Sequence, residues 1–243
     1  MSRVGVRGEI RGRLGAVQLE VRKRIQKQLY GPGQRLPSER ELSNEFEMPR
    51  VSLHECLVQL EAEGLIYRET NRGWYVSPPR FLYNPQSRGH FTQSAVEQGR
   101  RPSTRVIDKR LTPAPQQVSE LLELAAETEL ACIRRVRSID GRPVLYVEHY
   151  FSPTVFPDLF EQDLSGSLTE LYRDRYGFHY GRMRYQIIPT AVRNDAAKVL
   201  RLANGGPALL VRRVNHEASG RAKDCDLEYW RHDAVLVEVE VEN

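Results

Sequence analysis

Apolar residues recur at helical spacing near the start of the chain. Between residues 14 and 29 they fall on one stripe, made up of Leu14, Val17, Val21, Ile25 and Leu29. A stripe of this kind predicts an amphipathic helix with one buried face. The run Gly31-Pro32-Gly33 predicts its end, because proline and glycine interrupt helical hydrogen bonding.

Two further helices are predicted from capping signals. Ser38-Glu39-Arg40-Glu41 is a capping box, in which the Ser38 and Glu41 side chains each accept a hydrogen bond from an otherwise unpaired backbone N–H. It predicts a short helix that runs to about Phe46. Pro49 suits the first turn of a third helix, and Gly64 suits the position just after its end. The expected buried face of this third helix is Leu53, Cys56, Leu57 and Leu60.

Two short alternating runs, 65–68 and 73–77, then predict a β-hairpin. Three helices followed by a hairpin is the order of a winged helix-turn-helix. We therefore expect a first domain at 1–77. Pro78-Pro79 opens a stiff segment, and we expect a linker over 78–86.

Residues 87–243 show a different pattern, in which predicted helices and strands are mixed, and we expect them to form a second domain. Helices are expected at 115–126, 167–176 and 194–202, and strands at 104–111, 131–139, 143–151, 183–193, 207–217 and 224–241. Asp140-Gly141 lies between two alternating runs and predicts a tight hairpin turn. The second domain is therefore expected to be α+β with a mainly antiparallel sheet.

The composition is that of an ordinary folded protein, with 40% hydrophobic and 28% charged residues. No apolar run approaches the roughly 18 residues that span a bilayer, and the first residues, MSRVGVRGEIRGRLG, lack the apolar core of a secretory signal. Cys56, Cys132 and Cys225 are too widely spaced to suggest a disulfide framework or a zinc site. We expect a cytoplasmic protein without membrane association, metal or other cofactor.

The net charge of +4 is confined to the first third of the chain. The first 80 residues hold 14 Lys+Arg against 10 Asp+Glu, and the remainder is balanced. A basic segment on a neutral protein is typical of a polyanion binder. An excess of four charges is by itself also compatible with an incidental surface bias.

The third helix is the expected reading element, because its exposed side carries polar residues near its N-terminal end, where such helices contact bases. Arginine is the commonest partner of guanine, and the start of the second helix suits a phosphate. Each residue alone is more simply explained as solvated surface, but together they favour DNA contact. The candidates are Ser38, Glu39, Arg40, Arg50, Val51, Ser52, His54, Arg72 and Gly73.

The segments Leu36-Pro37-Ser38-Glu39-Arg40-Glu41-Leu42 and Leu60-Glu61-Ala62-Glu63-Gly64-Leu65-Ile66, with Arg50 between them, resemble the GntR family of regulators over roughly residues 10–77. In that family the arginines matching Arg40 and Arg50 read bases, and the residues matching Ser52 and Gly73 lie at the DNA. Position 54 is commonly arginine in relatives and is histidine here. Met48-Pro49 replaces a more usual Val-Ser.

The second domain is similar to the UTRA ligand-binding domain of the HutC subfamily. The resemblance rests on the order and spacing of Phe91, Gly99-Arg100, Arg135-Val136-Arg137, Asp140-Gly141-Arg142-Pro143, Glu148, Tyr150, Pro153, Arg231 and Asp233. It implies a fold like that of chorismate lyase, with an effector cleft on the sheet.

Arg135 and Arg137 are two apart on a predicted strand, so their side chains share one face. Paired guanidiniums suit an anion, although a surface ladder with Glu148 and Glu228 explains the pair equally well. The resemblance favours the anion. It implies that both arginines grip a phosphate with groups matching His90, Phe91 and Thr92, while Glu148, Ser167 and Glu228 line the rest of the cleft.

Arginines at one end and carboxylates, including Asp226, at the other suit a zwitterion. Phe81-Leu82-Tyr83-Asn84-Pro85, leading to Phe91, loosely resembles regulators of phosphonate breakdown, which makes 2-aminoethylphosphonate a candidate effector. A sugar phosphate, an amino-acid-like acid such as urocanate, and no ligand at all remain alternatives.

The function expected from these observations is transcription regulation, with repression as the default. The resemblance implies a homodimer that reads a pseudo-palindromic operator. A chorismate-lyase-like enzyme is the distant alternative, since no catalytic triad order, metal-ligand spacing or phosphate loop is present in the sequence. An architectural DNA binder would need no cleft.

Overall fold

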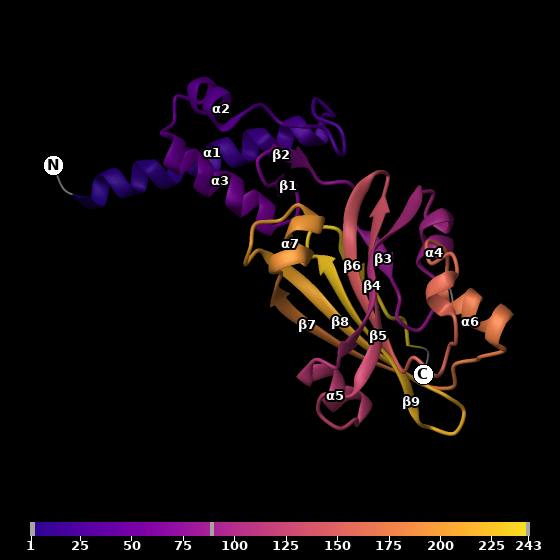
Figure 1. The fold of residues 1–243 in the computed structure, drawn as a ribbon. Coiled ribbons are helices and arrows are strands. Elements are labelled where there is room, and N and C mark those ends of the chain that lie inside the picture. Colours follow the sequence, from indigo (N-terminus) through magenta and orange to yellow (C-terminus); the bar gives the residue numbers. More distant parts are fainter. Residues whose placement is uncertain (1–2, 88–89, 242–243) are drawn as a thin grey trace. The chain divides into compact units, whose positions relative to one another are not determined.

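The computed structural model describes residues 3–87 and 90–241 (Figure 1). Its contacts divide the chain into two compact units, Met1–Arg80 and Phe81–Asn243. No helix in the described residues is both long enough and apolar enough to cross a membrane.

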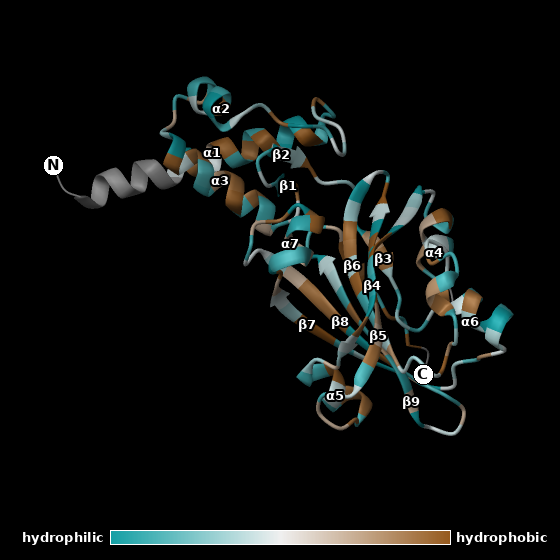
Figure 2. Ribbon diagram, in the orientation of Figure 1, coloured by the Kyte–Doolittle hydropathy of each residue, from teal (hydrophilic) through white to brown (hydrophobic). Residues whose placement is uncertain are grey.

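The N-terminal unit contains three helices and a hairpin, in the predicted order. The helices are α1 (Arg3–Gln26), α2 (Glu39–Glu45) and α3 (Arg50–Ala62), and the hairpin pairs β1 (Ile66–Glu69) with β2 (Gly73–Val76). Figure 2 shows hydrophobic and hydrophilic stretches alternating along α3, as expected of a helix with one buried face. That face is the predicted one, and Leu53, Cys56, Leu57 and Leu60 are all fully buried.

The predicted signals around α2 and α3 are present. Both hydrogen bonds of the capping box form, from Ser38 N to Glu41 Oε2 (2.7 Å) and from Glu41 N to Ser38 Oγ (3.2 Å). Pro49 is the residue that precedes the first turn of α3, and Gly64 follows the helix with a φ of +78°.

The first helix differs from the prediction at both ends. It begins at Arg3 and stops at Gln26, two residues before Gln28 adopts a left-handed φ of +57°. The chain therefore leaves the helix before Leu29, whose side chain is 62% exposed and is not part of the buried stripe. Val17 and Val21 do lie in the core, with Leu14 and Ile25 packed against it.

The C-terminal unit is built on a six-stranded sheet in which every neighbouring pair is antiparallel, in the order β4-β5-β6-β9-β8-β7. The strands are β4 (Pro102–Pro113), β5 (Glu129–Ile139), β6 (Arg142–Phe151), β7 (Met183–Ala191), β8 (Pro207–His216) and β9 (Ala222–Arg231). The prediction of an α+β domain with a mainly antiparallel sheet is confirmed.

Helices cover both faces of this sheet. On one face α4 (Phe91–Glu97) and α6 (Leu168–Tyr176) pack against apolar side chains of β5, β6 and β9. On the other face lie α5 (Gln116–Leu122) and α7 (Asn194–Leu200). A short 3₁₀ helix, η1 (Leu159–Glu161), precedes α6. We call the two surfaces of the sheet the α4/α6 face and the α5/α7 face.

Three elements depart from the sequence analysis. Residues Phe81–Tyr83, within the expected linker, form β3, which pairs in parallel with β10 (Val235–Val237). The expected final strand over 224–241 is therefore two strands, separated by a turn in which Ala234 N donates to Arg231 O. The seven-residue helix α4 was not predicted.

Candidate nucleic-acid interface and ligand cavity

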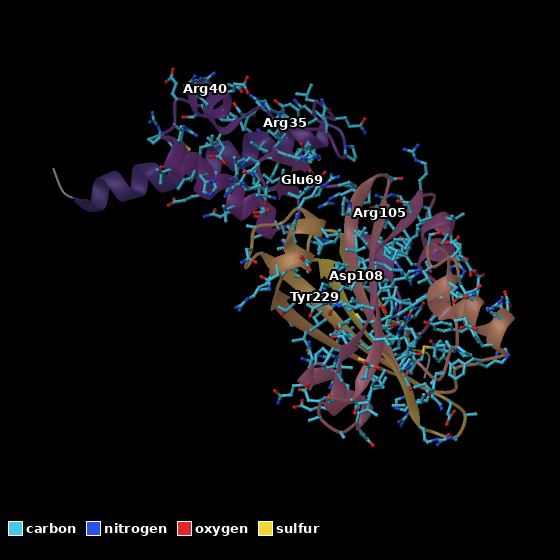
Figure 3. All side chains as sticks on the ribbon, viewed as in Figure 1. Arg35, Arg40, Glu69, Arg105, Asp108 and Tyr229 are labelled. Carbon is cyan, nitrogen blue, oxygen red and sulfur yellow. The ribbon has the colours of Figure 1, made fainter. Side chains whose placement is uncertain are left out.

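The first turns of α3 present the predicted reading residues to solvent. Arg50 and Val51 are exposed, the latter by 75%, while Ser52 and His54 are half-buried. The buried face of α3 fixes this orientation, because the polar positions lie on the opposite side of the same helix. Arg40 projects from α2 and is also exposed (Figure 3).

A groove joins the start of α2, the start of α3 and the hairpin. Its walls include the predicted residues Ser38, Glu39, Arg50 and Gly73. Sequence reasoning missed three further polar members, which are Arg35, Arg68 and Asn71. No periodic or capping signal distinguishes them in the sequence, since only folding brings the hairpin beside α2. Three arginines in one groove suit the phosphates of a nucleic acid backbone.

The hairpin turn has its own structural requirement for glycine. Gly73 has a φ of +101°, and a Cβ at this position would lie 3.3 Å from Arg35 Nε. The neighbouring Arg72 side chain is 57% exposed and lies 3.6 Å from Glu69. Arg72 is thus available at the surface, whereas Gly73 is already explained by the turn and by the close approach of Arg35.

Glu39 makes its contacts inside the N-terminal unit. Its Oε1 accepts hydrogen bonds from Trp74 Nε1 (2.8 Å) and from His54 Nδ1 (3.1 Å). Burial alone would raise the pKa of Glu39, but the hydrogen bonds from Trp74 and His54 outweigh it and leave the pKa lowered. The carboxylate is therefore a charged acceptor that links α2, α3 and β2.

A cavity lies on the α4/α6 face of the C-terminal unit. It is lined from β3, α4, β5, α6 and β9, and its volume is about 90 Å³. Six of the eight predicted effector residues line it: His90, Phe91, Arg135, Arg137, Ser167 and Glu228. Residues that the sequence analysis did not assign to it include Tyr83, His149, Tyr180, Arg213, Asn215 and Asp224.

Arg135 is fully buried, and its hydrogen bonds go to the protein. Its Nη1 donates to the carbonyls of Leu164 (3.1 Å) and Gly166 (2.8 Å), in the segment before α6. Its Nε donates to His149 Nε2 at 3.1 Å. Burial, followed by the nearby charge of Arg137, lowers the pKa of Arg135 to about 9. This side chain fixes the wall of the cavity.

Arg137 makes fewer hydrogen bonds to the protein than Arg135 does. Its guanidinium carbon lies 5.1 Å from the centre of the Phe91 ring, and its Nε has no hydrogen-bond partner among the described residues. Burial lowers the pKa of Arg137. Tyr83 OH is a second buried polar atom of the cavity that lacks a partner within the described chain. A cation and a hydroxyl without partners suit an anionic ligand.

Carboxylates and a third arginine also line the cavity. Arg213 Nε donates to Asp226 Oδ2 at 2.8 Å, and Arg213 Nη2 lies 3.7 Å from Glu228 Oε1. His149 Nδ1 donates to Asp226 Oδ1 at 2.5 Å, which leaves His149 Nε2 to accept from Arg135. Burial lowers the pKa of His149 to about 4, so the ring is a neutral bridge.

Asp224 carries the one strongly raised carboxyl pKa of the described residues. It accepts from Tyr180 OH at 2.6 Å and from Asn215 Nδ2. Burial and the adjacent charge of Asp226 raise the pKa of Asp224 to about 7. The cavity therefore combines three arginines with three acidic residues, of which Asp224 is partly protonated near neutral pH.

Glu148 does not line this cavity, contrary to the prediction. A regular two-residue hairpin at Asp140-Gly141 would place Glu148 opposite Ile133, on the face of Arg135. The strands instead shift register between Arg137 and Ser138, so Glu148 pairs with Arg134 and points to the α5/α7 face. There Glu148 lies 3.1 Å from Arg134 Nε and accepts from two tyrosine hydroxyls.

Thr92 and His90 also differ from the expected arrangement. Thr92 is exposed on the first turn of α4 and does not line the cavity. His90 does line it, but its Nδ1 caps α4 by accepting from Gln93 N, and its Nε2 lies 3.0 Å from Glu170 of α6. His90 therefore ties the two covering helices together.

Comparison with known proteins identifies both parts of the chain. Residues 15–76 match the model of the bacterial regulatory proteins of the gntR family, and residues 97–235 match the UTRA domain. YihL of Escherichia coli K12, named an uncharacterized HTH-type transcriptional regulator, is 34% identical over 84% of this chain and 87% of its own. NagR of Bacillus subtilis, named an HTH-type transcriptional repressor, is 26% identical over 83% of each chain.

A solved structure has the same fold along almost the whole chain. The crystal structure of PhnF from Mycobacterium smegmatis aligns with a TM-score of 0.64 at 22% identity, and the alignment covers 93% of this chain and 99% of that one. At this level of identity the likeness concerns the fold.

Proposed function

Because the chain belongs to the GntR family of bacterial regulators, in the HutC-like subfamily with a UTRA domain, we propose that it is a transcriptional repressor released from its operator by a small anionic metabolite. Regulators of this family bind DNA, and the UTRA domain binds a small effector. The repressing sign is supported by the likeness to NagR.

The proposal for DNA reading rests on α3. Arg50 and Val51 lie exposed at its first turn, beside a groove that also holds Arg35 and Arg68. Arginine at this position suits a guanine edge, and an exposed valine suits a thymine methyl group. Two such helices in a homodimer would read the two halves of a pseudo-palindromic operator.

The proposal for an anionic effector rests on one observation, the unpartnered Nε of Arg137 in the cavity. Tyr83 OH adds a donor without a partner in the described residues. Asp226 and Glu228 also line the cavity, each within reach of Arg213. An anionic group of the ligand would pair with Arg137, and an ammonium group would pair with the carboxylates.

The cavity volume narrows the effector class. The cavity volume of about 90 Å³ favours a small ligand. 2-Aminoethylphosphonate is a two-carbon zwitterion and is smaller than a hexose phosphate. We therefore propose 2-aminoethylphosphonate or a related small phosphonate as the effector.

Calorimetric titration of the full chain tests this proposal. We expect a measurable heat of binding with 2-aminoethylphosphonate and a smaller heat with inorganic phosphate. Titration of the Arg137→Ala variant with 2-aminoethylphosphonate should give no heat of binding. Glucose 6-phosphate and urocanate serve as the competing ligands. Binding of either competitor with no response to the phosphonate would contradict the proposed effector.

The same protein in an operator-binding assay tests the proposed release. We expect the effector to favour an arrangement of the two reading helices that no longer matches the operator, which is a shift between two populations of the dimer. Operator affinity should then fall as effector is added. Tighter operator binding with effector present would make the protein a ligand-dependent binder rather than a repressor that is released.

A further inference from the structure

One carboxylate oxygen holds two aromatic side chains beside the groove of the N-terminal unit. Glu39 Oε1 lies 2.8 Å from Trp74 Nε1 and 3.1 Å from His54 Nδ1. Trp74 Nε1 can only donate a hydrogen bond, and an ionised carboxylate can only accept one. The His54 contact therefore requires a proton on Nδ1, so Glu39 sets which ring nitrogen of His54 carries hydrogen.

This contact decides the chemistry of the other ring nitrogen. When Nδ1 of a neutral imidazole carries the proton, Nε2 has a free lone pair and accepts hydrogen bonds. The two nitrogens lie on different sides of the ring, so Nε2 is directed away from Glu39. The edge of the ring also meets Trp74, with centroids 6.0 Å apart and planes at 65°, which restricts its rotation.

His54 lies on α3, the helix that we propose to read the bases. It lies one turn after Arg50 on α3, and its side chain remains 40% exposed although Nδ1 is engaged. Glu39, Trp74 and Arg50 line the same groove. The imidazole is thus held on one side by Glu39 and Trp74, next to residues that line this groove, while 40% of its side chain remains exposed.

We propose that His54 reads an exocyclic amino group of a base through Nε2, and that Glu39 and Trp74 are the positioning residues that set this polarity. The proposal rests on the proposed function, because it assumes that α3 enters the major groove. In that groove adenine N6 and cytosine N4 are donors, whereas guanine and thymine present acceptors at the corresponding positions. His54 therefore selects adenine or cytosine, the opposite polarity to an arginine.

The test compares base preferences rather than overall affinity. Operator duplexes are selected from a random pool with the full-length protein, and the affinity for each base at each position is then measured at mildly alkaline pH. We expect one position in each half-site to favour adenine or cytosine by about three- to tenfold, the range of a single hydrogen bond. His54→Ala should abolish this preference at that position alone.

Variants of Glu39 separate positioning from general stability. Glu39→Ala should flatten the preference at the His54 position, because the ring is no longer held. Glu39→Gln should keep it, because the amide oxygen can still accept from both Trp74 and His54. His54→Arg should change the preferred base to guanine. Arg50→Ala is the matched control and should alter a different position. Circular dichroism verifies that each variant is folded.

The outcomes are distinguishable. If His54→Ala weakens all duplexes equally and leaves the base profile unchanged, His54 does not read a base and the inference is overturned. If Glu39→Ala leaves the profile intact while His54→Ala flattens it, Glu39 has no positioning role. If the wild-type protein selects no duplex at all, the proposed function itself fails.

Discussion

Arg135 and Arg137 are two residues apart on the same face of the same strand, yet their side chains make different contacts. Arg135 donates to two backbone carbonyls and to His149, so its charge stabilises the wall of the cavity. Arg137 packs its guanidinium on Phe91 and leaves Nε without a partner in the described chain. Arg135 thus supports the structure, whereas ligand binding is the role that we propose for Arg137.

This division predicts opposite phenotypes for two alanine variants. Arg135→Ala should lower the free energy of unfolding by about 2–5 kcal/mol, because buried carbonyls and an imidazole lose their donor. Arg137→Ala should leave the denaturation midpoint nearly unchanged and abolish effector binding. Urea denaturation and calorimetry measure the two effects. Arg110→Ala, an exposed position on β4, is the control and should change neither.

Asp224 predicts a pH dependence of stability. Its pKa is raised to about 7 by burial and by Asp226, so the folded state binds a proton more readily than the unfolded chain does between about pH 4 and pH 7. Through this group the free energy of unfolding therefore rises as the pH falls from about 7.5 toward about 5.

The Asp224→Asn variant removes the titrating group and should remove this rise. Urea denaturation at several pH values, compared between the wild-type chain and the variant, measures it. Equal pH slopes in the two proteins would mean that Asp224 is ionised throughout the range.

At the scale of elements, β3 lies after the β1–β2 hairpin and pairs with β10 near the C-terminus. Phe81 is 2% exposed and stacks on Trp230, with ring centroids 5.7 Å apart and planes at 11°. It also lies 5.6 Å from the ring of Phe91. The segment expected to be a linker thus supplies an aromatic residue to the core and Tyr83 to the cavity.

The role of β3 predicts an asymmetry between neighbouring residues. Phe81→Ala should cost about 3–5 kcal/mol of unfolding free energy, because it empties a packed aromatic site. Leu82→Ala changes a side chain that is 42% exposed and should cost about 0.5 kcal/mol or less. Denaturant titration of both variants measures the difference. Similar values for the two would show that β3 is not part of the stable core.

At the scale of the whole molecule, one protein carries two ligand sites in separate units. For a regulator of this kind the effector and the operator must influence each other equally. If the effector weakens operator binding by some factor, the operator must weaken effector binding by the same factor. This equality does not depend on how the units are arranged.

Because Arg50 and Arg137 lie in different units, alanine variants of the two should lose different functions. Arg50→Ala should lose operator affinity by about 1–3 kcal/mol and keep effector affinity. Arg137→Ala should keep its operator affinity, and addition of effector should no longer release this variant from the operator. Fluorescence anisotropy with labelled operator, and calorimetry with and without operator, measure both factors. Loss of effector affinity in Arg50→Ala, or of operator affinity in Arg137→Ala, would contradict the assignment of the two residues to separate sites.

Local chemistry in the sequence determined much of this protein. The capping box at Ser38, the end of α3 at Gly64 and the four buried residues of α3 follow from interactions within a few residues along the chain. The alternation of a strand likewise placed Arg135 and Arg137 on one face. The resemblance to UTRA sequences supplied six residues that line the cavity, since motif order is carried by the chain itself.

Only the tertiary structure decided which distant segments meet. The bulge between Arg137 and Ser138 turned Glu148 to the other face of the sheet, and a one-residue shift of this kind has no clear signature in the sequence. The pairing of β3 with β10, the Arg213–Asp226–His149 network and the Glu39–His54–Trp74 contacts join residues far apart in the chain. Strand register and long-range packing decide such contacts, because they depend on the competition among all possible partners rather than on any local pattern.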